Sequence, residues 1–234
     1  MRKRLLAFIM ALTMVLTLLP VSALARPLDS GVTSDGFKWD ITDSVLTISG
    51  SGAMTDYGTA ACPWRQYING IREIVVSEGV TYIGERAFDG LVWLEKVTLP
   101  SSLKSLGNRA FQGCVRLPGI TLPNGLESIG DYAFYNCTLE RIAIPNSVKR
   151  IGELAFYDCA QLKSLSIPGG LTDIGDSAFN GCVGLADKNG LIIVNNIVFG
   201  YSEELPTSPV IPEGVTRIAA HAFSHSRMEG ITLP

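Results

Sequence analysis

The chain has 234 residues, and 47% of them are hydrophobic, which is enough apolar material for a sizeable buried core. Its 19 basic and 22 acidic residues give a formal net charge of −3 at pH 7. A nucleic-acid-binding surface requires clustered basic residues, so this acidic balance argues against that class, and we expect no nucleic-acid partner.

The N-terminus is typical of a secretory signal peptide. A basic head covers residues 2–4, an apolar stretch covers 5–19, and 23–25 have the Ala-x-Ala pattern of a cleavage site. An uncleaved membrane anchor is the alternative, but the stretch is shorter than the roughly 20 residues that a span requires. We therefore expect residues 1–25 to be removed, leaving a secreted or cell-surface protein without a membrane span.

Residues 26–70 lack the repeat that follows and are expected to form an N-terminal β-hairpin cap. Segments 37–41 and 45–48 alternate apolar and polar residues around a short turn, as the two strands of a hairpin do. A solenoid must cover the open end of its first repeat, so we expect Trp39 and Trp64 to pack there. A carbohydrate-binding platform built from these tryptophans is the alternative.

The pair Ala-Phe recurs along the rest of the chain, at steps of 23, 23, 22, 23 and 44 residues. A period of 20 to 29 residues is the signature of a solenoid, in which each unit buries its apolar face only against its neighbours. We therefore expect a solenoid over residues 71–234 with a period of 22–23. The phenylalanines should stack in a buried ladder: Phe88, Phe111, Phe134, Phe156, Phe179 and Phe223.

Five repeats also carry the pattern Leu-x-x-Ile-x-Ile-Pro, and the first, from Ile71, lacks the proline. The alternation in this pattern predicts a short strand with one face inward, ended by a proline that cannot donate to a ladder. The clearest strands are expected near residues 96–99, 119–122, 141–144 and 164–167. A second apolar pair and a glycine follow, and then Asp131 or Asp176 is expected to cap a single helical turn at Ala-Phe. The predicted fold is mainly β, a solenoid of short strands and single helical turns preceded by a small β cap.

The Ile-Pro, Ile-Gly and Ala-Phe-x-x-Cys elements together resemble the BspA-like class of leucine-rich repeats, which is found in bacterial surface proteins. The match covers residues 71–234, and the stretch 46–64 is similar to the leader that often precedes such repeats. The resemblance implies a leucine-rich-repeat fold and a secreted or surface-attached role in adhesion or partner binding. It does not imply an enzyme. Members differ in ligand, so it transfers no site residues.

The 44-residue step contains an insertion near residues 186–209. Within it, apolar segments 191–194 and 197–199 flank Asn195-Asn196, which predicts a hairpin with a two-residue turn. This hairpin either replaces one repeat within the stack or projects from it as a loop. Because the last residue follows a predicted strand directly, we expect the array to be truncated at 234.

Four cysteines stand three residues after the motif phenylalanines, at Cys114, Cys137, Cys159 and Cys182. Leu91 occupies the same place in another repeat, which indicates an apolar site. Stacked side chains point in parallel, whereas the Cβ vectors of a disulfide must converge, and a line of thiols does not make a tetrahedral metal site. We therefore expect a ladder of buried, reduced thiols.

No motif predicts a catalytic, metal or cofactor site. His221 and His225 are four residues apart, but no carboxylate or cysteine of fixed spacing completes a ligand set, so we interpret both as exposed turn residues. The chain has no Gly-x-Ser-x-Gly nucleophile elbow.

The candidate binding face is the outward side of the predicted strands. Residues between the inward apolar positions alternate outward, which places six polar side chains on one surface: Lys96, Thr98, Thr121, Arg141, Ser164 and Ser166. Lys96 and Arg141 are expected to pair with anionic groups of a ligand. An ordinary solvated face is the alternative, with the insertion near 186–209 as another possible site.

Three functions are compatible with these patterns. The first is a non-enzymatic binding or adhesion module on an exported protein, presenting its repeats to an extracellular protein or glycan. The second is a structural spacer in a longer exported protein whose activity lies beyond residue 234. The third, a secreted hydrolase with an unrecognised site, has the least support.

Overall fold

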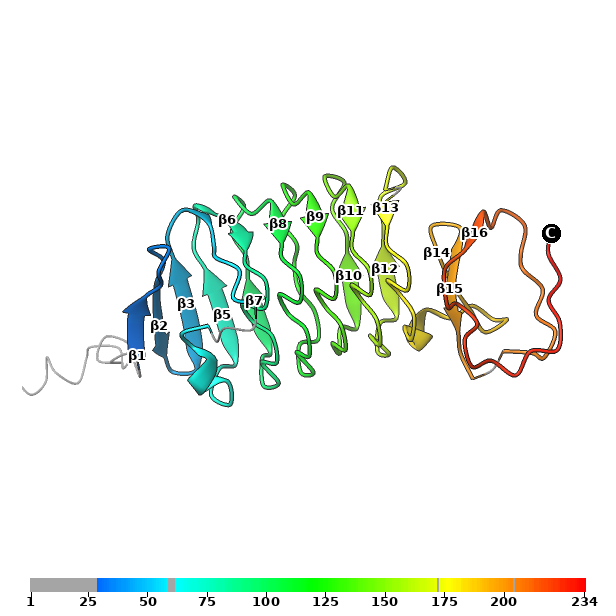
Figure 1. Cartoon of the computed structure of the whole chain (residues 1–234), viewed down its shortest axis with the longest axis horizontal. Helices are drawn as coiled ribbons and strands as arrows, with labels where there is room; N and C mark the ends of the chain where they lie inside the picture. Colours follow the sequence, from blue (N-terminus) through cyan, green and yellow to red (C-terminus); the bar gives the residue numbers. More distant parts are fainter. Residues whose placement is uncertain (1–28, 59–61, 172, 204) are drawn as a thin grey trace, which may run out of the picture.

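Coils of about 23 residues stack side by side into an elongated solenoid (Figure 1). The computed structural model describes residues 29–58, 62–171, 173–203 and 205–234. The predicted signal peptide at 1–25 lies outside these residues. The fold is mainly β with almost no helix, as predicted.

The strands are short, and most coils contribute one to each of two faces. In chain order they are β1 (Asp29–Val32), β2 (Lys38–Thr42), β3 (Val45–Ser49), β4 (Gly52–Ala53), β5 (Glu73–Val76), β6 (Val80–Ile83), β7 (Lys96–Thr98), β8 (Ser105–Leu106), β9 (Ser128–Ile129), β10 (Arg141–Ala143), β11 (Arg150–Ile151), β12 (Ser164–Ser166), β13 (Asp173–Ile174), β14 (Leu191–Val194), β15 (Ile197–Tyr201) and β16 (Arg217–Ile218). Within the described residues there are two 3-10 helices, η2 (Arg65–Tyr67) and η3 (Val183–Leu185). No helix of the described residues has the length and apolar character needed to cross a bilayer.

Parallel pairing between successive coils builds the two faces. On the first, which we call the strand face, β3, β5 and β7 pair in parallel, and so do β10 and β12. On the second, β4, β6, β8, β9, β11 and β13 form one unbroken parallel sheet. Equivalent residues of neighbouring repeats are register partners wherever their strands pair, as Ile74 and Val97 are.

The Ala-Phe segments form consecutive tight turns rather than the single helical turns that were predicted. The residue before each alanine is left-handed, with φ between 53° and 60°, and this interrupts any helix; these residues are Arg86, Arg109, Tyr132, Leu154, Ser177 and His221. In place of hydrogen bonds within a helix, the turns form hydrogen bonds between neighbouring coils. The Phe88 N–H donates to the Ala110 carbonyl at 2.9 Å, and the Phe111 N–H donates to the Ala133 carbonyl at 2.8 Å.

The acidic residues before these turns do not cap their own turn. The Asp131 carboxylate accepts from the Glu153 N–H of the next coil at 2.9 Å, and the Asn108 side-chain oxygen accepts from the Asp131 N–H at 2.8 Å. These side chains therefore join neighbouring coils, because the left-handed residue that follows directs the main chain away from a helix.

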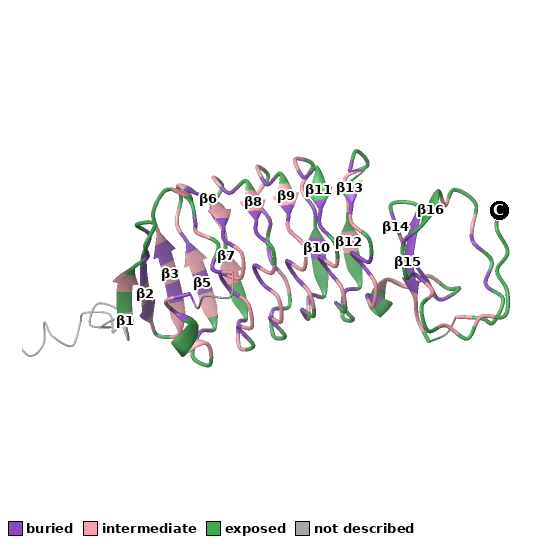
Figure 2. Cartoon of the chain, in the orientation of Figure 1, coloured by how far each residue is buried: buried purple, intermediate pink, exposed green. Residues whose placement is uncertain are grey.

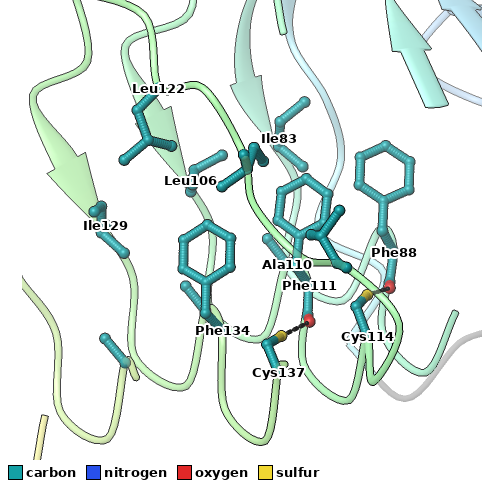
Figure 3. Packing of buried hydrophobic residues seen from close by; sticks show 14 of the residues in the cluster. Ile83, Phe88, Leu106, Ala110, Phe111, Cys114, Leu122, Ile129, Phe134 and Cys137 are labelled. Atoms are coloured by element: carbon teal, nitrogen blue, oxygen red, sulfur yellow. Dashed lines mark hydrogen bonds between the residues drawn. The ribbon is translucent and has the colours of Figure 1, made fainter. Parts of the chain in front are cut away.

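A column of aromatic rings runs through the centre of the stack (Figure 3). Ring centroids of successive phenylalanines from Phe88 to Phe179 are 5.2 to 5.5 Å apart, and every ring is fully buried. Trp64 continues the column before Phe88, with centroids 6.0 Å apart, and its indole N–H donates to the Ala87 carbonyl at 2.7 Å. This contact fixes the N-terminal segment against the first repeat.

The N-terminal hairpin forms where it was predicted. β2 and β3 pair antiparallel, and the turn residues Asp43 and Ser44 have φ of 50° and 68°. Trp39, from β2, packs edge-on against Trp64 with centroids 6.2 Å apart and is only 7% exposed. Neither tryptophan therefore presents a free ring face as a carbohydrate platform.

The insertion replaces a repeat within the stack. β14 and β15 form a hairpin whose turn residues Asn195 and Asn196 have φ of 50° and 60°. Phe199 on β15 continues the aromatic column, 5.3 Å from Phe179. Phe223, which was expected in that column, stacks instead on Tyr201 in a second, smaller cluster. Phe199 of the hairpin occupies the position in the column that was expected for Phe223.

The four ladder cysteines are free and buried. Figure 3 shows two of them, Cys114 and Cys137, beside the phenylalanines. Each thiol donates to the carbonyl of the phenylalanine one repeat earlier: Cys137 Sγ lies 3.1 Å from the Phe111 oxygen, and Cys182 Sγ lies 3.0 Å from the Phe156 oxygen. A small apolar side chain with a weak hydrogen-bond donor therefore suits these four positions. Burial raises the pKa of the Cys137 and Cys182 thiols well above the ordinary value.

We expect Phe134→Ala to lower the free energy of unfolding by about 3–5 kcal/mol, because it opens a cavity between two stacked rings. Lys149→Ala, at an exposed position, is the control and should change it by less than about 0.5 kcal/mol. Urea unfolding followed by circular dichroism measures both. Equal midpoints for the wild type and Phe134→Ala would refute a stabilising aromatic column.

We also expect Cys114, Cys137, Cys159 and Cys182 to resist iodoacetamide in the native protein and to react fully after unfolding without reductant. Their burial excludes the reagent, and the raised thiol pKa of Cys137 and Cys182 suppresses the reactive thiolate. Mass spectrometry of the alkylated peptides measures this. A stoichiometric disulfide between adjacent repeats would contradict it.

Candidate functional site

A shallow groove of about 1210 Å³ lies along the strand face. It extends from β7 across residues 119–125 to β10 and β12. We call it the strand-face groove. All six predicted binding-face residues line it: Lys96, Thr98, Thr121, Arg141, Ser164 and Ser166.

The groove follows directly from strand alternation. In β10, Arg141 and Ala143 are exposed while Ile142 between them is buried, and Figure 2 shows β10 and β12 with exposed residues on either side of a less exposed one. Lys96 and Thr98 are likewise exposed on β7. The outward side chains of successive coils therefore share one surface.

The predicted strand at 119–122 is not formed, and the sheet of the strand face is interrupted there. β7 is the last strand of the first sheet, and β10 starts another. In the described residues, no backbone hydrogen bond or strand pairing joins β7 to 119–122, although Gly119 forms a bridge with Arg141 on the other side. The reason is Pro118, which stands where other repeats have a donor. In the equivalent position, the Lys163 N–H donates to the Glu140 carbonyl at 2.9 Å.

Gly119 deepens the groove between two cations. It occupies the outward position that carries Lys96 in the preceding coil and Arg141 in the following one. The apolar residues Val97 and Leu99 lie half-buried at the groove. A Cβ at Gly119 would lie 3.7 Å from the nearest atom, the Arg141 carbonyl oxygen, so the space beside it is free for a ligand or a larger side chain.

The two cations are not equivalent. Lys96 Nζ lies 2.7 Å from the Glu73 carboxylate, so its charge is already paired. Arg141 has no ion-pair partner among the described residues and is exposed. Of the two side chains expected to pair with an anion, Arg141 is therefore the one whose charge is free for a ligand.

Sequence reasoning missed an arginine–tryptophan cluster beside the groove. The Trp93 indole lies between Arg72, 5.2 Å from its ring centroid, and Arg116, 4.0 Å away. Glu95, which lines the groove, forms ion pairs with both arginines at 3.2 and 3.9 Å. A tryptophan at a variable repeat position was the available signal. Because guanidinium groups cover the ring and Glu95 balances their charge, the cluster stabilises its own coils.

Sequence reasoning also missed a row of tyrosines at the turns. The Tyr135 and Tyr157 rings stack 5.2 Å apart and nearly parallel, Tyr132 lies 5.7 Å from Tyr135, and the Arg109 guanidinium lies 4.8 Å from the Tyr132 centroid. The signal was a tyrosine directly after the motif phenylalanine in two consecutive repeats. The tyrosine rings pack against one another, so aromatic stacking between coils continues outside the buried phenylalanine column.

A smaller depression of about 470 Å³ lies beside the insertion and includes Tyr201, Leu205, His225 and Met228. His225 and His221 both lie in turns, with φ of 64° and 60°. Across the part of the chain that the structure describes, no three side chains of histidine, cysteine, aspartate or glutamate come together as a metal site.

The repeat pattern also matches a known family. The model of the BspA type leucine-rich repeat region matches residues 81–198, in six copies. The chain belongs to this family. A comparison with the curated proteins finds no match.

Solved bacterial leucine-rich repeat proteins share the fold. A leucine-rich repeat protein from Eubacterium ventriosum is 29% identical with a TM-score of 0.70; the alignment covers 87% of this chain and 59% of that one. The leucine-rich repeat protein of T. pallidum is 25% identical with a TM-score of 0.56, over 87% of this chain and 90% of that one. One from Bacteroides ovatus, at 24% identity and a TM-score of 0.59 over 88% and 63%, supports the fold alone. The chain thus spans about three-fifths of the Eubacterium protein's length.

Proposed function

We propose that this chain is a non-enzymatic binding module of an exported, cell-surface protein, and that it holds an extracellular protein or glycan in the strand-face groove. The observation that carries the proposal is the groove itself. Six outward polar residues from successive coils line it, one of them Arg141 with its guanidinium unpaired in the described part of the chain, and half-buried apolar residues lie beside them. A preformed concave surface of this mixed character is typical of ligand sites.

The family supports this assignment, since its members are repeat proteins that present surfaces. The N-terminal sequence pattern of residues 1–25 supports export. A role in adhesion is part of the proposal.

A structural spacer is the second candidate, because an elongated stack with a continuous aromatic column is also a rigid rod. The two differ in what the groove does. A spacer needs only the buried ladders and tolerates any change to the outward residues of the strand face.

We expect the double variant Lys96→Glu, Arg141→Glu to weaken binding of a ligand by about tenfold or more, because it replaces both groove cations with anions. Binding of the chain from residue 26 onward to arrays of extracellular-matrix proteins and glycans measures this. Lys149→Glu, which reverses an exposed charge outside the groove, is the matched control and should bind normally.

The melting temperature of Lys149→Glu should equal that of the wild type. That of the groove variant should fall only slightly, because Lys96 loses one largely exposed ion pair with Glu73 and Arg141 has none among the described residues. Unchanged binding by the groove variant would place the site elsewhere, with the depression beside the insertion tested next. No binding to any array component by the wild type would favour the spacer.

A further inference from the structure

We propose that the strand-face groove accepts an extended polypeptide segment with a carboxylate side chain, which pairs with Arg141 while a neighbouring side chain fills the space beside Gly119. The inference rests on the proposed function and names the chemical class of its ligand. It depends on three observations: the composition of the groove, the interrupted sheet, and the free guanidinium.

The composition favours a peptide over a sugar. None of the described residues that line the groove is aromatic. The apolar face of a sugar ring packs well on a flat aromatic ring, and the groove offers none. Its apolar surface comes instead from aliphatic side chains such as Val97 and Leu99, which suit the aliphatic side chains of a peptide.

The dimensions also suit an extended chain. The groove crosses four successive coils, from Lys96 to Ser166. Neighbouring strands lie about 4.8 Å apart, so four coils span about 14 Å, the length of four or five residues of an extended peptide at about 3.3 Å each. The threonine and serine hydroxyls that line the groove are able to donate hydrogen bonds to such a peptide and to accept them from it.

The interrupted sheet leaves main-chain groups without their usual partners. Where β10 meets β12, the Ile144 N–H donates to the Ser166 carbonyl at 2.8 Å and the Glu140 carbonyl accepts from the next coil. The equivalent bonds between β7 and residues 119–122 are missing among the described residues. The residues at this interruption, which include Val97, Gly119 and Thr121, line the groove. Extended peptides gain affinity from main-chain hydrogen bonds at open sheet edges, so we expect amide groups of a ligand lying over the interruption to use these main-chain groups.

Charge then selects the side chain. Glu73 neutralises Lys96, while Arg141 keeps a free, planar guanidinium that suits bidentate pairing with a carboxylate. Since Gly119 and Arg141 form a bridge, the carboxylate and the side chain beside Gly119 belong to adjacent parts of one ligand.

The test uses the whole exported chain and an array of hexapeptides. Each peptide carries one glutamate among Val, Leu, Thr, Ser, Ala and Gly, and has a partner with glutamine in its place. Polygalacturonate and a neutral β-glucan are the carbohydrate probes. We expect a subset of the glutamate peptides to bind, and their glutamine partners to bind about tenfold more weakly.

Three variants locate the contact. Arg141→Glu should abolish the preference for glutamate over glutamine. Gly119→Phe should fill the groove and reduce peptide binding about tenfold at an unchanged melting temperature, because a Cβ fits there without strain. Lys149→Glu is the control and should bind as the wild type does.

A fourth variant tests the interruption. Pro118→Ala restores the missing donor, so residues 118–121 should gain protection from hydrogen exchange and peptide binding should weaken severalfold. If this protection appears and peptide binding stays at full strength, the main-chain contacts we propose are wrong.

The remaining outcomes separate this inference from the proposed function. Binding of polygalacturonate or glucan that Arg141→Glu or Gly119→Phe abolishes, with no peptide bound, overturns the peptide inference and leaves the groove as the site. Peptide binding that neither variant changes overturns both. Equal binding of glutamate and glutamine peptides refutes the carboxylate contact.

Discussion

The stacking of each coil's phenylalanine on the next is the constraint on which the other features of this solenoid depend. Successive ring centroids stay within 5.2 to 5.5 Å from Phe88 to Phe179, although the step from Phe134 to Phe156 is one residue shorter than its neighbours. The residue is lost between Cys137 and Leu139, outside the strands. Length variation is thus absorbed in a loop because the column and the parallel ladders tolerate none.

The same constraint explains why functional variation appears on the surface as a departure from the repeat. Inward positions are constrained to apolar side chains by their neighbours, so outward residues have the wider freedom to differ from coil to coil. Pro118 and Gly119 leave the buried ladder of Leu117 and Ile120 intact, while they remove one donor and one side chain from the strand face. The groove results from these two absences, and the unbroken second sheet keeps the coils aligned beneath it.

Features set by the period were predictable, and features set by the context of one coil were not. The ladders, the N-terminal hairpin and the Asn195-Asn196 turn follow from residue spacing and from the tolerance of asparagine for positive φ. The six binding-face residues were placed together because strand alternation alone decides which way they point. The interruption at 119–122 was missed because Pro118 occupies a variable position, and whether its missing donor matters depends on the neighbouring coil.

The turns at Ala-Phe show how far the stack overrides local preference. A sequence with an acidic residue before Ala-Phe is typical of a helix start, and residues such as Leu154 are poor candidates for a left-handed conformation, which costs about 1–2 kcal/mol for a residue with a Cβ. Leu154 nevertheless has φ of 53°, and its N–H donates to the Asp176 carbonyl of the next coil at 3.2 Å. Only a neighbouring coil provides that acceptor. An isolated repeat would therefore have no reason to keep this turn, and the conformation of each coil, including its outward residues in the groove, is a property of the array.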